Sequence, residues 1–122
     1  VDFSTQGGND EISTKAAVEY IQDAGPDFTF IHLDDIDHAG HAVGFGTKYS
    51  KAIQKVDAQI GKLLKVVKAR EDKHGEDWLV ILVTDHGRDT KGKGHGNQTV
   101  GEKTIFIGLN KKGNRLFNAV DF

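Results

Sequence analysis

Two short apolar runs separated by one long amphipathic segment restrict the fold of this chain more than any other feature. The runs cover residues 28–33 (FTFIHL) and 78–84 (WLVILVT), and each is nearly continuous in apolarity, as strands covered on both faces are. The segment between them predicts a helix that Thr47 caps and that ends near residue 72. A strand, a helix and a strand in this order form a βαβ unit, so we expect two parallel strands and a right-handed crossover.

Shorter elements flank this unit, and the whole pattern predicts an α/β fold. Residues 1–9 predict a loop, residues 10–23 a covering helix with Asp10 as its cap, and residues 104–109 a last strand. The long helix has an apolar stripe that we expect to lie on the sheet: Ile53, Val56, Ile60, Leu63, Leu64 and Val67. Its other face carries lysines that favour a solvated surface over a polyanion-binding one: Lys48, Lys51, Lys55, Lys62, Lys65 and Lys68.

Length and charge limit the possible classes of protein. The 122 residues predict a single domain over 1–122, and a net charge of -2 with 28% charged residues leaves no nucleic-acid-binding signature. No apolar run reaches the roughly 20 residues of a membrane span. Because the chain has no cysteine, thiolate ligands are excluded, and any transition-metal site must use histidine and carboxylate side chains.

A dense polar segment follows the first predicted strand. Residues 34–46 read DDIDHAGHAVGFG and place an acid at Asp37 four residues before an imidazole at His41. We expect Gly40 and Gly44 to let the chain turn tightly around these two side chains. A DxxxH spacing also occurs by chance, so a turn acid and a surface histidine are the alternative for this segment alone.

The second predicted strand ends directly on another polar pair. Asp85 and His86 follow it, and residues 87–102 contain five glycines and no periodicity, which indicates a long loop around His95. In open α/β sheets ligands bind beyond the carboxyl ends of the strands, so we expect both polar segments to meet at one edge of the sheet. His95 alone could equally be an ordinary loop residue.

Together these side chains suit zinc or another divalent first-row metal in a hydrolytic site. The candidates are Asp37, His41, Asp85, His86 and His95. A catalytic zinc commonly takes three protein ligands and keeps an open position, so five ligands are too many for one ion and too few for two. This count predicts a two-metal site of which a part is missing.

The runs LDDIDHAGHAVGFG, LVTDHGR and GHGN resemble the metal-binding motifs of the alkaline phosphatase superfamily, closest to its type I phosphodiesterase and nucleotide pyrophosphatase branch. The resemblance implies that Asp37, His41 and His95 bind one zinc ion and that Asp85 and His86 bind the second metal. It also implies a partial alkaline-phosphatase-like sandwich, with a mainly parallel sheet flanked by helices. A secreted or periplasmic location is suggested by this resemblance only.

One part of the family pattern is missing from the sequence. In the family the second metal also takes an Asp and a nucleophilic Thr or Ser from an upstream segment, and residues 1–27 do not resemble that segment. We therefore expect residues 1–122 to be the carboxyl-terminal part of a larger metallohydrolase catalytic domain. It would carry one full zinc site and half of a second but no catalytic nucleophile. Its partners would be the upstream part of the same enzyme and a small-molecule phosphoester substrate.

The resemblance implies double displacement on a phosphoester, with two metals, most simply zinc, clamping the attacking and leaving oxygens. The fragment alone would bind about one ion and be inactive. Alternatives are a sulfatase, a phosphonoacetate hydrolase or a phosphomutase of the same superfamily, and a non-catalytic metal-binding or anion-binding module. A metal-free nucleotide-binding domain is disfavoured, because the usual phosphate loops are missing. His38 either orients a ligand or is exposed, and Arg88 is expected to be solvated rather than to face a phosphate.

Overall fold

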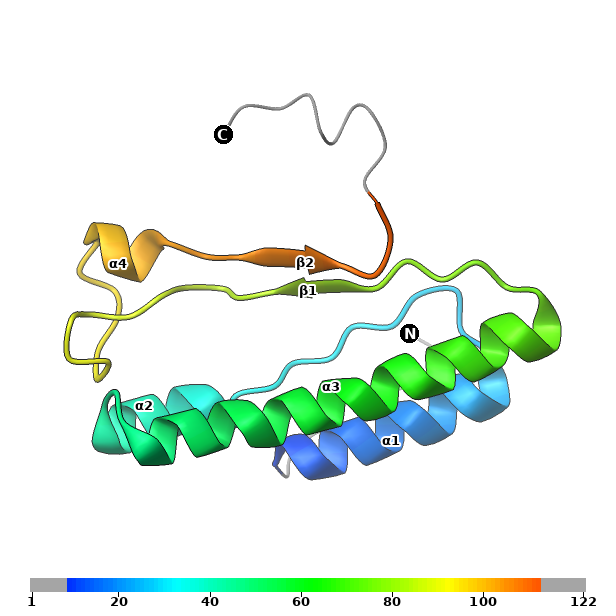
Figure 1. Cartoon of the computed structure of the whole chain (residues 1–122), viewed down its shortest axis with the longest axis horizontal. Helices are drawn as coiled ribbons and strands as arrows, with labels where there is room; N and C mark the ends of the chain where they lie inside the picture. Colours follow the sequence, from blue (N-terminus) through cyan, green and yellow to red (C-terminus); the bar gives the residue numbers. More distant parts are fainter. Residues whose placement is uncertain (1–8, 113–122) are drawn as a thin grey trace.

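The structure, a computed structural model, describes residues 9–112 as a layer of helices that lies beside a two-stranded sheet (Figure 1). In the helical layer α1 and α3 run side by side, and α2 packs against α3 at one end of the layer. The elements in chain order are α1 Asp10–Ala24, α2 Asp35–Val43, α3 Thr47–His74, β1 Ile81–Val83, α4 Val100–Lys103 and β2 Ile107–Leu109. Of the loop predicted for residues 1–9, residues 1–8 lie outside the described residues.

Helix α1 forms where the sequence predicts it, but its cap is a different residue. The side chain of Asn9 accepts hydrogen bonds from the backbone N–H groups of Glu11 and Ile12, and Gly25 ends the helix with a φ of 57°. Asp10 was therefore wrongly predicted as the cap. Its side chain is turned inward, with 2% of the residue exposed, toward the start of α2.

Helix α3 confirms the long predicted helix and extends it to His74, where Gly75 ends it with a φ of 69°. Gly46 rather than Thr47 is its N-cap. The apolar core lies between α3 and α1 and consists of Ala17, Ile21, Val56, Val66 and Val67.

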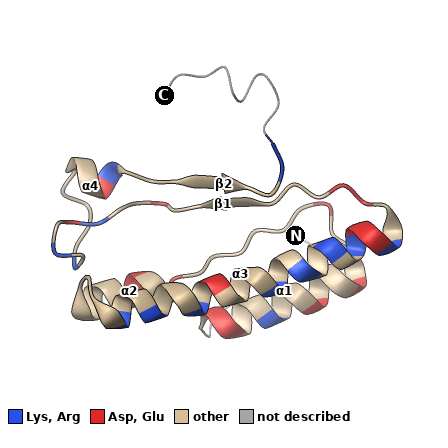
Figure 2. Cartoon of the chain, viewed as in Figure 1, with Lys and Arg blue, Asp and Glu red and all other residues tan. Residues whose placement is uncertain are grey.

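The apolar stripe of α3 was expected to lie on the sheet, and this prediction was wrong for part of it. Of the stripe, Val56 and Val67 are buried, whereas Ile53 is 44% and Leu64 41% exposed. The reason is that the sheet of the described residues is too small to cover a helix of 28 residues. The six lysines predicted to be solvated are exposed, and Figure 2 shows such charges along the outside of the helical layer.

The sheet differs from the predicted one. Strand β1 pairs with β2 in antiparallel register, with Ile81 opposite Leu109 and Val83 opposite Ile107. Residues 28–33 are extended but form no strand, so the described residues contain no parallel pair and no βαβ unit. The prediction of a mainly parallel sheet was wrong for this part of the chain, because a strand exists only where a neighbouring backbone completes its hydrogen bonds. The broader expectation of a mixed α/β chain agrees with the helices and the small sheet.

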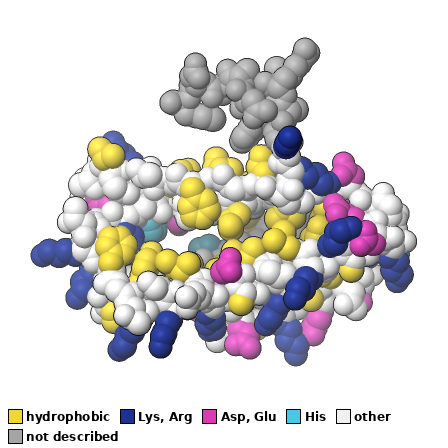
Figure 3. All heavy atoms as spheres, in the orientation of Figure 1, with side chains coloured by type: hydrophobic (Ala, Val, Ile, Leu, Met, Phe, Trp, Pro, Cys, Tyr) yellow, Lys and Arg dark blue, Asp and Glu magenta, His cyan; other side chains and the backbone are white. Residues whose placement is uncertain are grey.

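Apolar side chains line the space between the two layers and are not covered. Figure 3 shows them along both sides of a gap that separates the helical layer from the strands. Among the described residues, large apolar side chains with high exposure include Phe28 at 81%, Phe30 at 79%, Leu79 at 60% and Ile81 at 57%. An exposed apolar surface of this kind is typical of a site where further protein packs.

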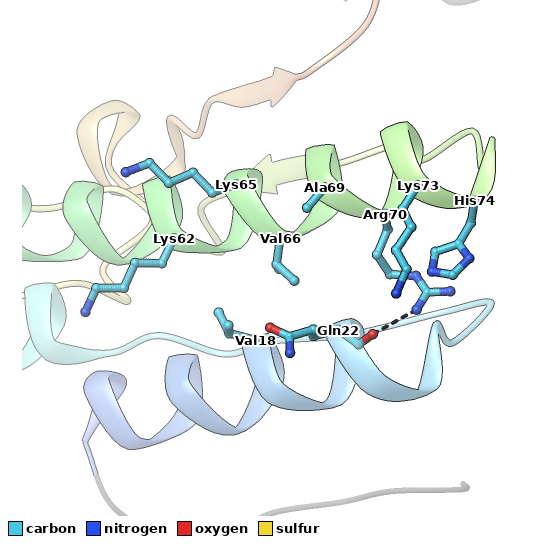
Figure 4. Close-up of a pocket in the computed structure, with 9 residues that line it drawn as sticks. All are labelled: Val18, Gln22, Lys62, Lys65, Val66, Ala69, Arg70, Lys73 and His74. Atoms are coloured by element: carbon cyan, nitrogen blue, oxygen red, sulfur yellow. Dashed lines mark hydrogen bonds between the residues drawn. The ribbon is translucent and has the colours of Figure 1, made fainter.

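Arg70, a largely buried residue near the end of α3, contacts both α1 and the segment that leads from α3 to β1. Figure 4 shows Arg70 beside the shallow pocket between the helices, where it donates to the Gln22 carbonyl over 2.9 Å. Arg70 also pairs with Glu76, and Trp78 donates to the same carboxylate over 2.7 Å. These hydrogen bonds, that of Arg70 first, lower the pKa of Glu76 to about 2.

No helix in residues 9–112 is both long and apolar enough to cross a membrane.

The small core makes a clear prediction about stability. Ile21 is 3% exposed. Ile21→Ala should lower the free energy of unfolding by about 2–4 kcal/mol, because the cavity that the substitution leaves cannot close fully. Ile53→Ala should cost less than about 1 kcal/mol, because that side chain is already half exposed. Urea unfolding followed by circular dichroism measures both, and equal losses would contradict the assignment of the core.

Candidate metal centre

Part of the predicted polar segment forms helix α2, which carries two of the candidate ligands. Asp37 and His41 are four residues apart within the helix, so their side chains lie on one face, one turn apart. The expectation of a tight turn at Gly40 was wrong, because Gly40 lies inside the helix. Gly44 does end the helix, with a φ of 69°, and there it passes directly against the Lys91 carbonyl.

The buried carboxylate of Asp10 holds the first turn of α2. One oxygen accepts a hydrogen bond from the N–H of Asp34 over 2.8 Å, and the other accepts from the N–H of Asp35 over 3.1 Å. These backbone donors would otherwise have no partner within α2, and a negative charge at a helix N-terminus is favourable. Asp10 therefore fixes where α2 starts relative to α1.

Two of the predicted ligands, His41 and His95, converge on the carboxylate of a third, Asp37. The His41 Nε2 atom lies 3.3 Å from Asp37 Oδ2, and the His95 Nε2 atom lies 3.6 Å from Asp37 Oδ1. The two Nε2 atoms are 3.0 Å apart, although 54 residues separate His41 from His95. The His41 side chain is 47% exposed and those of Asp37 and His95 are each 32% exposed, so the cluster is partly open to solvent.

His86 joins the same cluster through its Nε2 atom. Its Nδ1 atom lies 2.8 Å from the Gly87 carbonyl, which only accepts, so Nδ1 is the donor in this hydrogen bond and the Nε2 atom is left to face the cluster. That Nε2 atom is 3.7 Å from Asp37 Oδ1, and the ring stacks on His95 with centroids 3.8 Å apart. Metal-binding histidines usually donate their second N–H in this way.

Asp85 stands at the outer edge of the cluster. Its side chain is 79% exposed, and Asp85 Oδ1 lies 3.7 Å from His86 Nε2. The same oxygen accepts from the N–H of His86 over 2.9 Å. The structure thus brings together four of the five residues singled out in the sequence, Asp37, His41, His86 and His95, whereas Asp85 contacts only its neighbour in the chain, His86.

The donor set of the inner group fits a divalent metal ion. The ligand atoms of Asp37, His41 and His95 all lie within 4.8 Å of one another. Ligands placed about 2.0–2.2 Å from a tetrahedral zinc ion are roughly 3.3–3.6 Å apart, which is close to the separations found here. A carboxylate with two imidazoles is also a donor set that zinc and similar ions prefer.

A second acidic group lies on the same helix but is occupied by a lysine. Asp34, Asp35 and His38 bring their side-chain atoms within 4.8 Å of one another. Lys55 donates to Asp35 Oδ2 over 3.0 Å and so supplies a cation at this place. His38 is exposed and lies 3.8 Å from Asp34, so it orients no side chain of the Asp37 cluster.

The predicted long loop is ordered by two carboxylates. Asp89 accepts from the N–H groups of Lys91, Lys93 and Gly94 over 2.9–3.0 Å. Burial acts to raise the pKa of Asp89, but the backbone donors together outweigh burial and lower this pKa. The turn made in this way delivers the chain to His95.

Glu102 orders the second half of the loop and belongs to α4, an element the sequence did not predict. Its carboxylate accepts from the backbone and side chains of both Thr99 and Asn97, and the residue is 3% exposed. The Thr99 hydroxyl is the main cause of the low pKa of Glu102, about 2, while burial opposes the shift. The Glu102 carbonyl accepts from Gly87 over 2.8 Å, which closes the loop next to His86.

Arg88 is the site residue that the sequence interpretation missed. It was expected to be solvated, but its side chain is only 5% exposed and pairs with Asp37 Oδ1. The acid and the arginine are 51 residues apart, so no local sequence signal reveals the contact.

Comparison with known families agrees with the motifs. The model of the type I phosphodiesterase / nucleotide pyrophosphatase family matches residues 3–116. The chain therefore belongs to this family, within the branch indicated by its motifs. Neither the curated proteins nor the solved structures gave a match. The family identifies the chain as part of a phosphoester hydrolase of the phosphodiesterase type.

Replacing Asp10 tests its hold on α2. Asp10→Ala should lower the free energy of unfolding by about 1–3 kcal/mol, because two backbone donors lose a charged acceptor in a buried place. Asp10→Asn keeps one acceptor oxygen and should lose less. Asp23→Ala, an exposed change at the other end of α1, should stay within about 0.5 kcal/mol. Equal stability of Asp10→Ala and wild type in urea would contradict the role of Asp10.

The low pKa of Glu102 gives a prediction about acid. A carboxylate whose pKa is lowered by folding stabilises the fold above its unfolded pKa, and this contribution is lost as the pH falls toward the folded value of about 2. Wild type should thus be more stable than Glu102→Gln at neutral pH. The difference should shrink below about pH 4.5, as urea unfolding at a series of pH values would measure. A difference that stays constant in acid would contradict this interpretation.

Proposed function

We propose that this chain forms the metal-binding part of a two-metal phosphodiesterase, in which Asp37, His41 and His95 hold one zinc ion. The convergence of the two histidine Nε2 atoms on the Asp37 carboxylate carries this proposal. The family of the chain supports phosphoester hydrolysis as the reaction and a small-molecule phosphoester as the substrate. Bound in this group, the ion would supply Lewis-acid stabilisation to phosphoester oxygens.

The side chains contribute charge and orientation. Asp37 provides a negative charge that offsets part of the charge of the ion, and His41 and His95 offer neutral nitrogen donors. The hydrogen bond from His86 Nδ1 to the Gly87 carbonyl keeps the His86 Nε2 lone pair directed at the cluster. Together with Asp85, His86 would then provide half of the second metal site, which we expect to bind weakly on its own.

The remaining ligand and the nucleophile would come from an upstream segment of the same enzyme. Within residues 9–112, no side-chain hydrogen bond or ion pair of the Asp37 cluster involves a Ser or Thr hydroxyl. The uncovered apolar side chains between the two layers offer that segment a surface on which to pack. A strand inserted there would also give residues 28–33 the neighbour they lack.

Zinc titration tests the first metal site. The chain should bind about one zinc ion with a dissociation constant in the low-micromolar range or tighter, measured by isothermal titration calorimetry. His41→Ala and His95→Ala should each weaken binding about a hundredfold or more, because each removes one of three ligands. His74→Ala removes an exposed histidine at the end of α3 and should bind as wild type does.

Two results would contradict the proposal. A folded wild-type chain that binds no zinc would exclude the site, and so would a His41→Ala variant with wild-type affinity. By itself the zinc-loaded chain should turn over no aryl phosphodiester, because the nucleophile is expected from the upstream segment. Turnover that His41→Ala abolishes would show that the chain contains its own nucleophile.

A further inference from the structure

We propose that Arg88 is the positioning residue of this centre, because it locks Asp37 in the orientation in which the carboxylate can share an ion with His41 and His95. This inference rests on the proposed metal site and adds a residue to it. Arg88 would touch neither the ion nor the substrate. It would act through Asp37 alone.

The guanidinium of Arg88 joins the two segments that carry the candidate ligands. Its Nη2 group pairs with Asp37 Oδ1 and donates to the Asp37 backbone carbonyl over 2.6 Å, and both acceptors belong to α2. Its Nη1 group donates to the Gly92 carbonyl over 3.2 Å, in the turn that leads to His95. The planar fork of arginine can serve these acceptors at once, which the point charge of a lysine cannot do.

The guanidinium of Arg88 is closely surrounded by residues of α2 and α3. The aromatic ring of Tyr49, in the first turn of α3, lies 5.9 Å from the guanidinium carbon. On the opposite helix a side chain at Gly40 would overlap the guanidinium, so the absence of a side chain there makes room for it. Gly40 is thus explained by the passage of Arg88 and not by a turn in the chain.

The positive charge of Arg88 acts against the proposed role. A guanidinium next to a metal ligand repels the cation, so a pure charge effect predicts tighter zinc binding when Arg88 is removed. Positioning predicts the reverse, because a freed Asp37 must be ordered again each time the ion binds. The two effects therefore have opposite signs, and zinc affinity distinguishes them.

Three variants separate position from charge. Arg88→Met removes both the fork and the charge, and Arg88→Lys keeps the charge without the fork. Gly40→Ala keeps the arginine but displaces its guanidinium. The last change should favour α2 by helix propensity, so a loss of zinc affinity could not come from a weaker helix.

The chain offers a matched control for each kind of change. Gly61→Ala adds a methyl group within α3 where nothing lies within 4 Å. Arg70→Met removes another largely buried arginine with a carboxylate partner and a carbonyl acceptor, at the far end of α3. Both controls should bind zinc within about twofold of wild type, because changes at distant sites act independently.

The measurements are zinc affinity by calorimetry and the visible spectrum of the cobalt(II)-loaded chain, with urea unfolding of each metal-free variant. We expect Arg88→Met, Arg88→Lys and Gly40→Ala to lose about tenfold to a hundredfold in zinc affinity, and their cobalt spectra to differ from wild type. The controls should keep the wild-type spectrum. A purely structural role of Arg88 would lower stability, as in Arg70→Met, without altering the spectrum.

Wild-type or tighter zinc binding by Gly40→Ala and Arg88→Lys would overturn the inference while the metal site itself stands. If Arg88→Met does not fold, these two variants, which keep the charge, decide the question. A wild-type chain without zinc affinity would overturn the proposed function, and the role of Arg88 with it.

Discussion

The ion pair between Arg88 and Asp37 joins the two segments on which the candidate ligands lie. Asp37 and His41 are held by α2, whereas His86 and His95 follow β1, and the buried guanidinium bonds to both segments. A buried charge must keep its partners, since the loss of one leaves the other uncompensated. The relative position of α2 and the loop after β1 is therefore the constraint on which the geometry of the cluster depends.

Helix α2 has nine residues and depends on its neighbours for its place. Asp10 reaches its first backbone donors from α1, and α1 is itself packed on α3 through the apolar core. Glu102 supports the other segment in the same manner, because its carboxylate satisfies the donors of Asn97 and Thr99 just beyond His95. Two buried carboxylates far from each other in the chain thus hold the surroundings of the cluster.

The two sides of the molecule are completed to different degrees. The ligand cluster already has its supporting contacts, whereas the apolar side chains between the helical layer and the strands remain uncovered. The family assigns the chain to the phosphodiesterases, and an enzyme of this type needs both a metal site and a nucleophile to act. The uncovered apolar side chains are therefore a surface on which a further segment can pack.

Helices α1 and α3 and the candidate ligands could be predicted from the sequence, because helical periodicity and ligand motifs depend on side chains close together in the chain. The predictions of a strand at residues 28–33, a helix cap at Asp10 and a solvated side chain at Arg88 were wrong. All three features depend on contacts between parts of the chain that are far apart in the sequence. A strand needs a neighbouring backbone, and the contacts of Asp10 and Arg88 join residues 24 and 51 positions apart, which no local pattern encodes.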